Sequence, residues 1–97
     1  MLMEEQIAKF KQALPDVSPE ILEEALDCLR VCEAGGLPSV YMAEFDYSHV
    51  KDPKLRQLMR AFYDFVMWTD EHLRDSDDKR TGMRYLLAHR NKCIDSL

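Results

Sequence analysis

The stretch that decides the fold is DPKLRQLMRAFYDFVMWTDEHLR, residues 52–74. Asp52 followed by Pro53 is a helix-start signal, because the carboxylate can cap free amides and the fixed φ of proline suits the first helical position. Large apolar side chains then recur at helical spacing on two neighbouring stripes. The first stripe is Leu55, Met59, Phe62, Val66 and Leu73, and the second is Leu58, Ala61, Phe65 and Trp68. So broad an apolar face predicts a central helix over about residues 53–74 that packs on two sides.

Three further helices are expected around this one. Residues 3–14 carry apolar side chains at helical spacing. A second helix is predicted over about residues 19–34, because Ser18-Pro19 is another start signal and Gly35-Gly36 favours a helix end. A last helix begins after a Ser76 cap and runs to the C-terminus. The polar turn before it is so short that the last two helices must form an antiparallel hairpin.

Residues 37–51 have a mixed pattern that fits either a short helix or a strand. Tyr41, Phe45 and Tyr47 alternate as in a strand, but a lone strand would have no partner in this chain. A short helix or an ordered loop is therefore favoured. The sequence predicts a single all-α domain over residues 1–97, a small bundle of about four helices with a long antiparallel C-terminal hairpin.

The length and composition indicate a small globular protein. A chain of 97 residues can bury one modest core, and 46% hydrophobic with 32% charged residues is ordinary for a folded domain. No apolar run approaches the roughly 18 residues needed to cross a bilayer, and the N-terminus lacks the features of a signal peptide. The three cysteines are odd in number and lie in apolar helical patterns, which suits reduced thiols. We therefore expect a soluble, cytoplasmic protein that makes no membrane contact.

The charge is unevenly distributed along the chain. The net charge is -5, but residues 1–49 carry -7 and residues 50–97 carry +2. An acidic second helix would repel phosphate, so DNA binding through the first two helices as a helix-turn-helix is not expected. Only the C-terminal half is suited to receive an anion.

Motifs for catalysis are missing from the sequence. It has no glycine-rich phosphate loop, no G-x-S-x-G elbow and no H-E-x-x-H, so we expect neither an enzyme nor a bound cofactor. Cys28 and Cys32 share a helical face, and His49, His72 and His89 could complete a zinc site. Packing in the core is the favoured role for these cysteines, so no metal is predicted. A small metal-binding or enzymatic helical protein is the least favoured alternative.

The second helix has an acidic outward side, formed by Glu20, Glu23, Glu24, Asp27 and Glu33. Such a face is often merely solvated, but it could also dock on a basic surface of another protein. A second possible surface comes from aromatic side chains in the loop: Tyr41, Phe45 and Tyr47. Together with Tyr63 and Met67 they exceed what a small bundle hides easily. Surplus apolar surface indicates a partner, and a two-fold homodimer is the simplest one.

The predicted hairpin gathers positive charge at one end, from Arg56, Arg60, Arg90 and Lys92. Arg90 lies in line with apolar positions of the last helix. Two interpretations stay open. The stem of Arg90 could pack while its head reaches Asp64 or solvent, or the four cations could form a phosphate or carboxylate site.

The last hairpin resembles a known family. Residues 75–80, Asp-Ser-Asp-Asp-Lys-Arg, followed by Thr81-Gly-Met-Arg-Tyr-Leu-Leu87, are similar to the C-terminal hairpin of phage-encoded cyclic-oligonucleotide sponges that disarm CBASS immunity. The likeness covers about the last third of the chain. It implies an oligomer that sequesters signalling nucleotides without cleaving them, and it assigns no individual binding residue.

The leading hypothesis from the sequence is a non-catalytic helical interaction protein. It would be an inhibitor or adaptor of the phage or mobile-element type that binds a host protein through the acidic helix or the aromatic loop. The alternative is an oligomeric sponge for cyclic oligonucleotides that uses the basic end.

Overall fold

The computed structural model describes residues 2–36 and 44–97, with only the backbone of Leu2. Its four helices are α1 (Leu2–Gln12), α2 (Glu20–Arg30), α3 (Pro53–His72) and α4 (Asp77–Asp95). The described part contains no strand beyond one isolated bridge between Ala34 and Leu73. The predicted all-α class with about four helices is confirmed.

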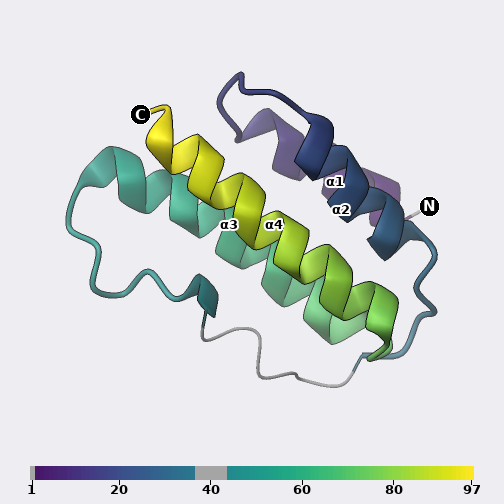
Figure 1. Cartoon of the computed structure of the whole chain (residues 1–97). Coiled ribbons are helices and arrows are strands. Elements are labelled where there is room, and N and C mark those ends of the chain that lie inside the picture. The colour runs from purple at the N-terminus through teal and green to yellow at the C-terminus, as the bar shows by residue number, and fades with distance from the viewer. Residues whose placement is uncertain (1, 37–43) are drawn as a thin grey trace.

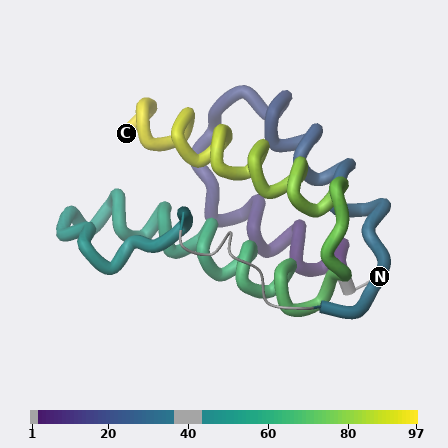
Figure 2. Tube along the Cα trace, turned by 60° about the horizontal axis from the view of Figure 1, so that its bottom comes forward, coloured from purple at the N-terminus to yellow at the C-terminus, as the bar shows by residue number. Residues whose placement is uncertain are grey.

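The helices form a four-membered bundle (Figures 1 and 2). α3 and α4 run antiparallel, as the short turn between them requires. α4 packs most closely against α2 on its other side, and α1 lies along α3. Two ion pairs close the ring by joining α1 to α2: Lys11 to Glu23 at 2.6 Å and Arg30 to Glu4 at 2.9 Å.

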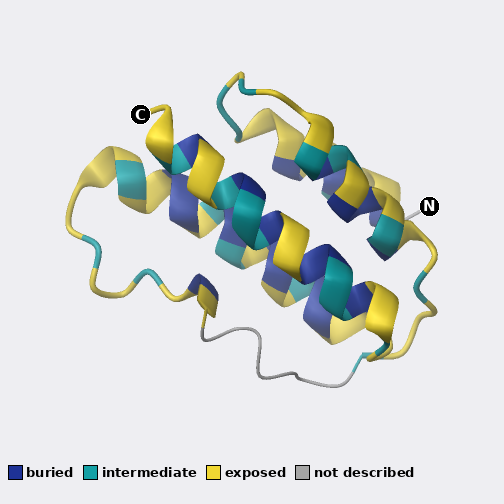
Figure 3. Ribbon diagram, viewed as in Figure 1, coloured by how far each residue is buried: buried dark blue, intermediate teal, exposed yellow. Residues whose placement is uncertain are grey.

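One hydrophobic core is shared by all four helices, and buried residues recur along each of them in Figure 3. Phe10 of α1 is central to it, since its ring stacks on Phe65 at 4.3 Å and meets Phe62 edge-on at 4.9 Å. Both partners belong to the broad apolar face predicted for α3. α2 contributes Ala25, Leu26 and Leu29 and α4 contributes Met83, Leu86 and Cys93, all 0–1% exposed.

The starts of the two long helices follow the sequence signals. The Asp52 carboxylate accepts a hydrogen bond from the Leu55 amide at 3.1 Å, and the Ser76 hydroxyl accepts one from the Lys79 amide at 3.1 Å. Both caps satisfy amides that have no partner inside the helix. None of the described helices is long and apolar enough to span a membrane.

α2 differs from its prediction at both ends. No side chain caps its start: Pro19 already has helical φ and ψ, and its carbonyl accepts from the Glu23 amide at 2.8 Å. The helix ends at Arg30, four residues before the predicted end. The chain then turns toward the end of α3, where Gly35 has a φ of +118° and its amide donates to the His72 carbonyl at 3.0 Å. The glycine therefore serves this contact between segments, because few other residues adopt that φ.

The segment between α2 and α3 is described only from residue 44 onward. Residues 44–50 contain no strand; a single turn of 3-10 helix and a further turn form an ordered loop. This agrees with the favoured prediction for this part. Residues 37–43, Tyr41 included, lie outside the described residues.

Candidate functional site

The acidic side of α2 is accessible in the structure. Glu20, Glu24 and Asp27 are exposed and Glu23 is half-buried. Two of these acids form ion pairs within the chain: Glu23 pairs with Lys11, and Asp27 pairs with Arg30 at 2.9 Å. Glu20 and Glu24 make no ion pair among the described residues, so they carry the uncompensated charge of this face.

Negative charge extends from α2 onto the start of α4. Asp78 lies in the first turn of α4, is exposed, and has no ion pair in the described part of the chain. Burial raises the pKa of the Cys28 thiol, and the nearby Asp78 carboxylate raises it further. Asp27 and Glu24 add to the same effect. Helices α2 and α4 therefore share a negative field around Cys28, which disfavours a reactive thiolate there.

The described residues do not form a metal site. Among residues 2–36 and 44–97, no three His, Cys, Asp or Glu side chains are placed to hold one ion together. Cys28, Cys32 and Cys93 are free thiols. The Cys32 thiol donates to the Cys28 carbonyl at 3.3 Å and lies 3.7 Å from the Ser76 hydroxyl, so it joins the end of α2 to the start of α4.

The aromatic loop is less exposed than the sequence suggested. Phe45 is only 1% exposed and belongs to the core, so it is not available to a partner as predicted. Its burial follows from the way residues 44–50 fold back onto the hairpin. Tyr47 is half-buried, with its ring edge-on to Tyr63 at 5.4 Å. Within the described residues, the aromatics of this loop are thus covered largely by the chain itself.

Two of the four predicted anion-binding cations hold this loop. Arg56 donates to the carbonyls of Tyr47 and Val50 at 3.2 and 3.0 Å, and its guanidinium lies 4.9 Å from the Tyr47 ring. Arg90 donates to the Glu44 carbonyl at 2.9 Å and lies 5.6 Å from the Phe45 ring. The guanidinium of Arg90 therefore contacts the loop. One interpretation of the sequence had placed it near Asp64 or in solvent. Burial lowers the pKa of its guanidinium.

The other two predicted cations, Arg60 and Lys92, are both exposed. Arg60 pairs with Asp64 at 3.7 Å on the exposed side of α3, and Lys92 is exposed on α4. Arg56 and Arg90 already donate to backbone carbonyls of the loop, so part of the predicted set of cations is engaged within the chain.

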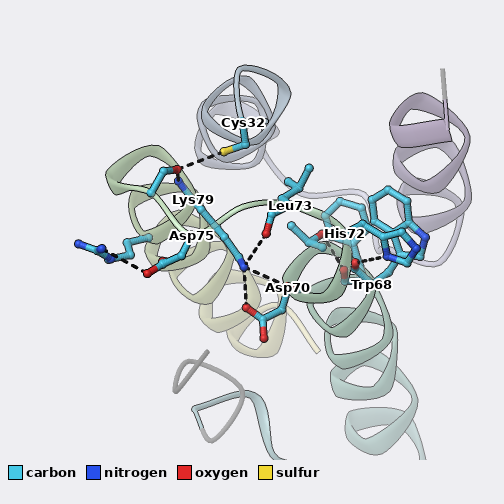
Figure 4. Close-up of polar contacts among 11 residues, drawn as sticks. Cys32, Trp68, Asp70, His72, Leu73, Asp75 and Lys79 are labelled. Carbon is cyan, nitrogen blue, oxygen red and sulfur yellow. Dashed lines mark hydrogen bonds and ion pairs between the residues drawn. The ribbon is translucent and has the colours of Figure 1, made fainter. Parts of the chain in front are cut away.

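A buried ion pair that the sequence analysis missed lies at the α3–α4 turn (Figure 4). The side chain of Lys79 is fully buried and its ammonium lies 2.9 Å from the Asp70 carboxylate. The same ammonium donates to the carbonyls of Asp70 and Leu73 at 3.1 and 3.0 Å. The ammonium thus has three oxygen neighbours, and the carbonyls of Asp70 and Leu73 at the end of α3 each accept a hydrogen bond from it. The signal was present, because Lys79 has helical spacing to the buried Met83 and Leu86.

His89 is a second buried polar group of α4. Its side chain is 1% exposed and close to Phe62, and its Nδ1 has no hydrogen-bond partner among the described residues. Burial lowers the pKa of its imidazole, and the positive charge of Lys92 lowers it further. The neutral form is therefore the one that fits the fold.

This predicts a loss of stability in mild acid. Because the folded-state pKa of His89 lies below its ordinary value of 6.5, the unfolded chain binds a proton first as the pH falls. The contribution of neutral His89 to the free energy of unfolding is complete above about pH 6.5. It is lost as the pH falls toward the folded-state pKa, and the free energy of unfolding then decreases by at most about 1.4 kcal/mol per pH unit. Urea unfolding at pH 7.5 and 5.5 measures this.

Replacing His89 tests whether it is the responsible group. A His89→Leu variant should show a shallower pH dependence than the parent, because the buried imidazole is gone. Equal pH dependence in the parent and His89→Leu would show that His89 is not the responsible group.

Comparison with known proteins adds no relative: no family model, curated protein or solved structure matches the chain. The candidate surfaces are therefore judged on the chain's own geometry.

Proposed function

We propose that the protein is a non-catalytic interaction module that acts in the cytoplasm as an inhibitor or adaptor by docking on a basic surface of a host protein. The observation that carries the proposal is the outward side of α2, where Glu20 and Glu24 are exposed and make no ion pair with any described residue. Uncompensated surface charge of one sign favours partners of the opposite sign and speeds their association.

The acidic face supports binding better than the aromatic loop does. Phe45 is buried, and Tyr47 packs on Tyr63. By contrast, the acidic face of α2 keeps a net negative charge although Glu23 and Asp27 form ion pairs. Asp78 of α4 extends this acidic face. A rigid helix that presents charge in this way needs no rearrangement to bind.

Sequestration of a cyclic oligonucleotide is the less supported alternative. It needs cations that converge on phosphates. The guanidinium groups of Arg56 and Arg90 instead donate to loop carbonyls, which leaves Arg60 and Lys92 for a ligand.

The homodimer is likewise a proposal, and it rests on fewer residues than the sequence suggested. The exposed large apolar side chains are Val31, Met67, Tyr85 and Leu97 among the described residues. Light scattering at micromolar concentration distinguishes a dimer from a monomer near 11.4 kDa.

The proposal is tested by reversing the uncompensated charges. Glu20→Lys with Glu24→Lys should weaken binding of a protein captured from a bacterial lysate by roughly tenfold or more, because attraction becomes repulsion. These two acids are chosen because reversing Glu23 would also break its ion pair between α1 and α2. Calorimetry with the captured protein measures the affinity.

A matched control keeps the same change of net charge. Glu71→Lys with Asp95→Lys alters exposed acids of α3 and α4 and should leave binding within about twofold. An equal loss of affinity in both double variants would show that the net charge of the protein, and not the acidic face of α2, determines binding. Capture of nucleotides and no protein would instead favour the sponge.

A further inference from the structure

A surface groove of about 330 Å³ lies between α1 and α3, on a side of the bundle that the proposed function does not use. Its aromatic lining consists of Phe10, Phe65 and Trp68. It is open because Ala13 and Ala61, which also line it, have small side chains. Its volume falls at the lower end of the range for small-molecule sites, which are mostly apolar with a few polar groups.

The aromatic lining favours a flat ligand. Trp68 is half-buried, and one face of its indole stacks on His72 at 4.4 Å and 10° (Figure 4). This stacking, and the bond between the His72 ring and the Trp68 carbonyl at 2.8 Å, join the two rings at the end of α3. A second ring placed against the indole would gain offset stacking without moving the helix.

The charge at the groove favours an anion. Two charged residues line it, Lys9 of α1 and Asp64 of α3. The Asp64 carboxylate is compensated by Arg60, whereas Lys9 makes no ion pair among the described residues. The side-chain amide of Gln6 also lines the groove, and it can donate hydrogen bonds. Lys9 is therefore the one charged residue lining the groove that makes no ion pair among the described residues.

We propose that this groove binds a small planar aromatic anion, with the ring against Trp68 and the anionic group on Lys9. The ring occupies the space left by Ala13 and Ala61. The carboxylate or similar group accepts from the Lys9 ammonium at the α1 side of the groove. Binding here is separate from the acidic face of α2, so either proposal can fail without the other.

Trp68 provides the readout, because it is the only tryptophan of the chain. Titration with naphthalene-2-carboxylate should give a saturable change in Trp68 fluorescence. The neutral 2-naphthalenemethanol should bind roughly tenfold more weakly, since it lacks the charge-assisted contact. No saturable change with the carboxylate would overturn the proposal.

Two variants locate the ligand. Lys9→Met keeps a good helix former in α1 and should reduce carboxylate affinity to that of the neutral compound. Ala61→Met fills the groove and should abolish binding; if it lowers the thermal midpoint, Ala13→Met fills the same space from the other side. Unchanged binding in these filled variants would place the ligand elsewhere. Equal binding of both compounds to the parent would make the groove an apolar anchor, suited to a partner's aromatic side chain, and would overturn the anion assignment.

Discussion

Lys79→Met should lower the free energy of unfolding by about 3–5 kcal/mol, because it leaves the buried Asp70 carboxylate without its counter-charge. The side chains are 0% and 5% exposed, so water cannot replace the ammonium. The substitution also removes the donor to the carbonyls of Asp70 and Leu73 at the end of α3. Urea unfolding followed by circular dichroism measures the change.

The double variant tests the cause. Adding Asp70→Leu to Lys79→Met removes the uncompensated charge and should restore most of the loss. A deficit of about 1–2 kcal/mol should remain, because the two carbonyls still lack a donor. A double variant as unstable as Lys79→Met alone would show that the packing of the lysine stem matters more than the charge.

The fold was largely predictable because local sequence signals mark where most of the helices begin and which of their faces are buried. Asp52-Pro53 and Ser76 mark helix starts, and both capping bonds are present. The two apolar stripes of α3 are mostly buried, as their spacing requires. The end of α2 was predicted wrongly, because Gly35 serves a contact with His72 that lies far away in sequence.

The candidate site was less predictable, because it depends on which side chains meet across elements. The acidic face could be read from one helix, but the ion pair of Glu23 with Lys11 depends on where α1 packs. The sequence suggested that Arg56 and Arg90 could bind an anion. No local pattern indicates that carbonyl groups of the loop before α3 will accept hydrogen bonds from both. The groove at Trp68 is likewise lined by two small residues from different segments, Ala13 just after the end of α1 and Ala61 in α3, which no single pattern reveals.

Gly82, like Gly35, is a glycine whose role depends on a contact between distant segments that the sequence does not reveal. It lies in α4 where this helix crosses α2, and it is buried. A Cβ at this position would lie 2.8 Å from Cδ2 of Leu29 and 3.2 Å from the carbonyl oxygen of Ala25. The missing side chain therefore explains why α2 and α4 pack more closely than any other pair.

Gly82→Leu should destabilise the fold by about 3 kcal/mol, at the upper end for an overpacked core, because the larger side chain forces α2 and α4 apart. Gly82→Ala should cost less, since the gain in helix propensity of about 1 kcal/mol offsets part of the clash. Arg84→Leu is the control: the same side chain on the exposed face of α4 should change stability by no more than about 0.5 kcal/mol. Thermal unfolding compares the three variants with the parent. Stability of Gly82→Leu equal to that of Arg84→Leu would mean that the two helices do not approach each other as closely as the structure has them.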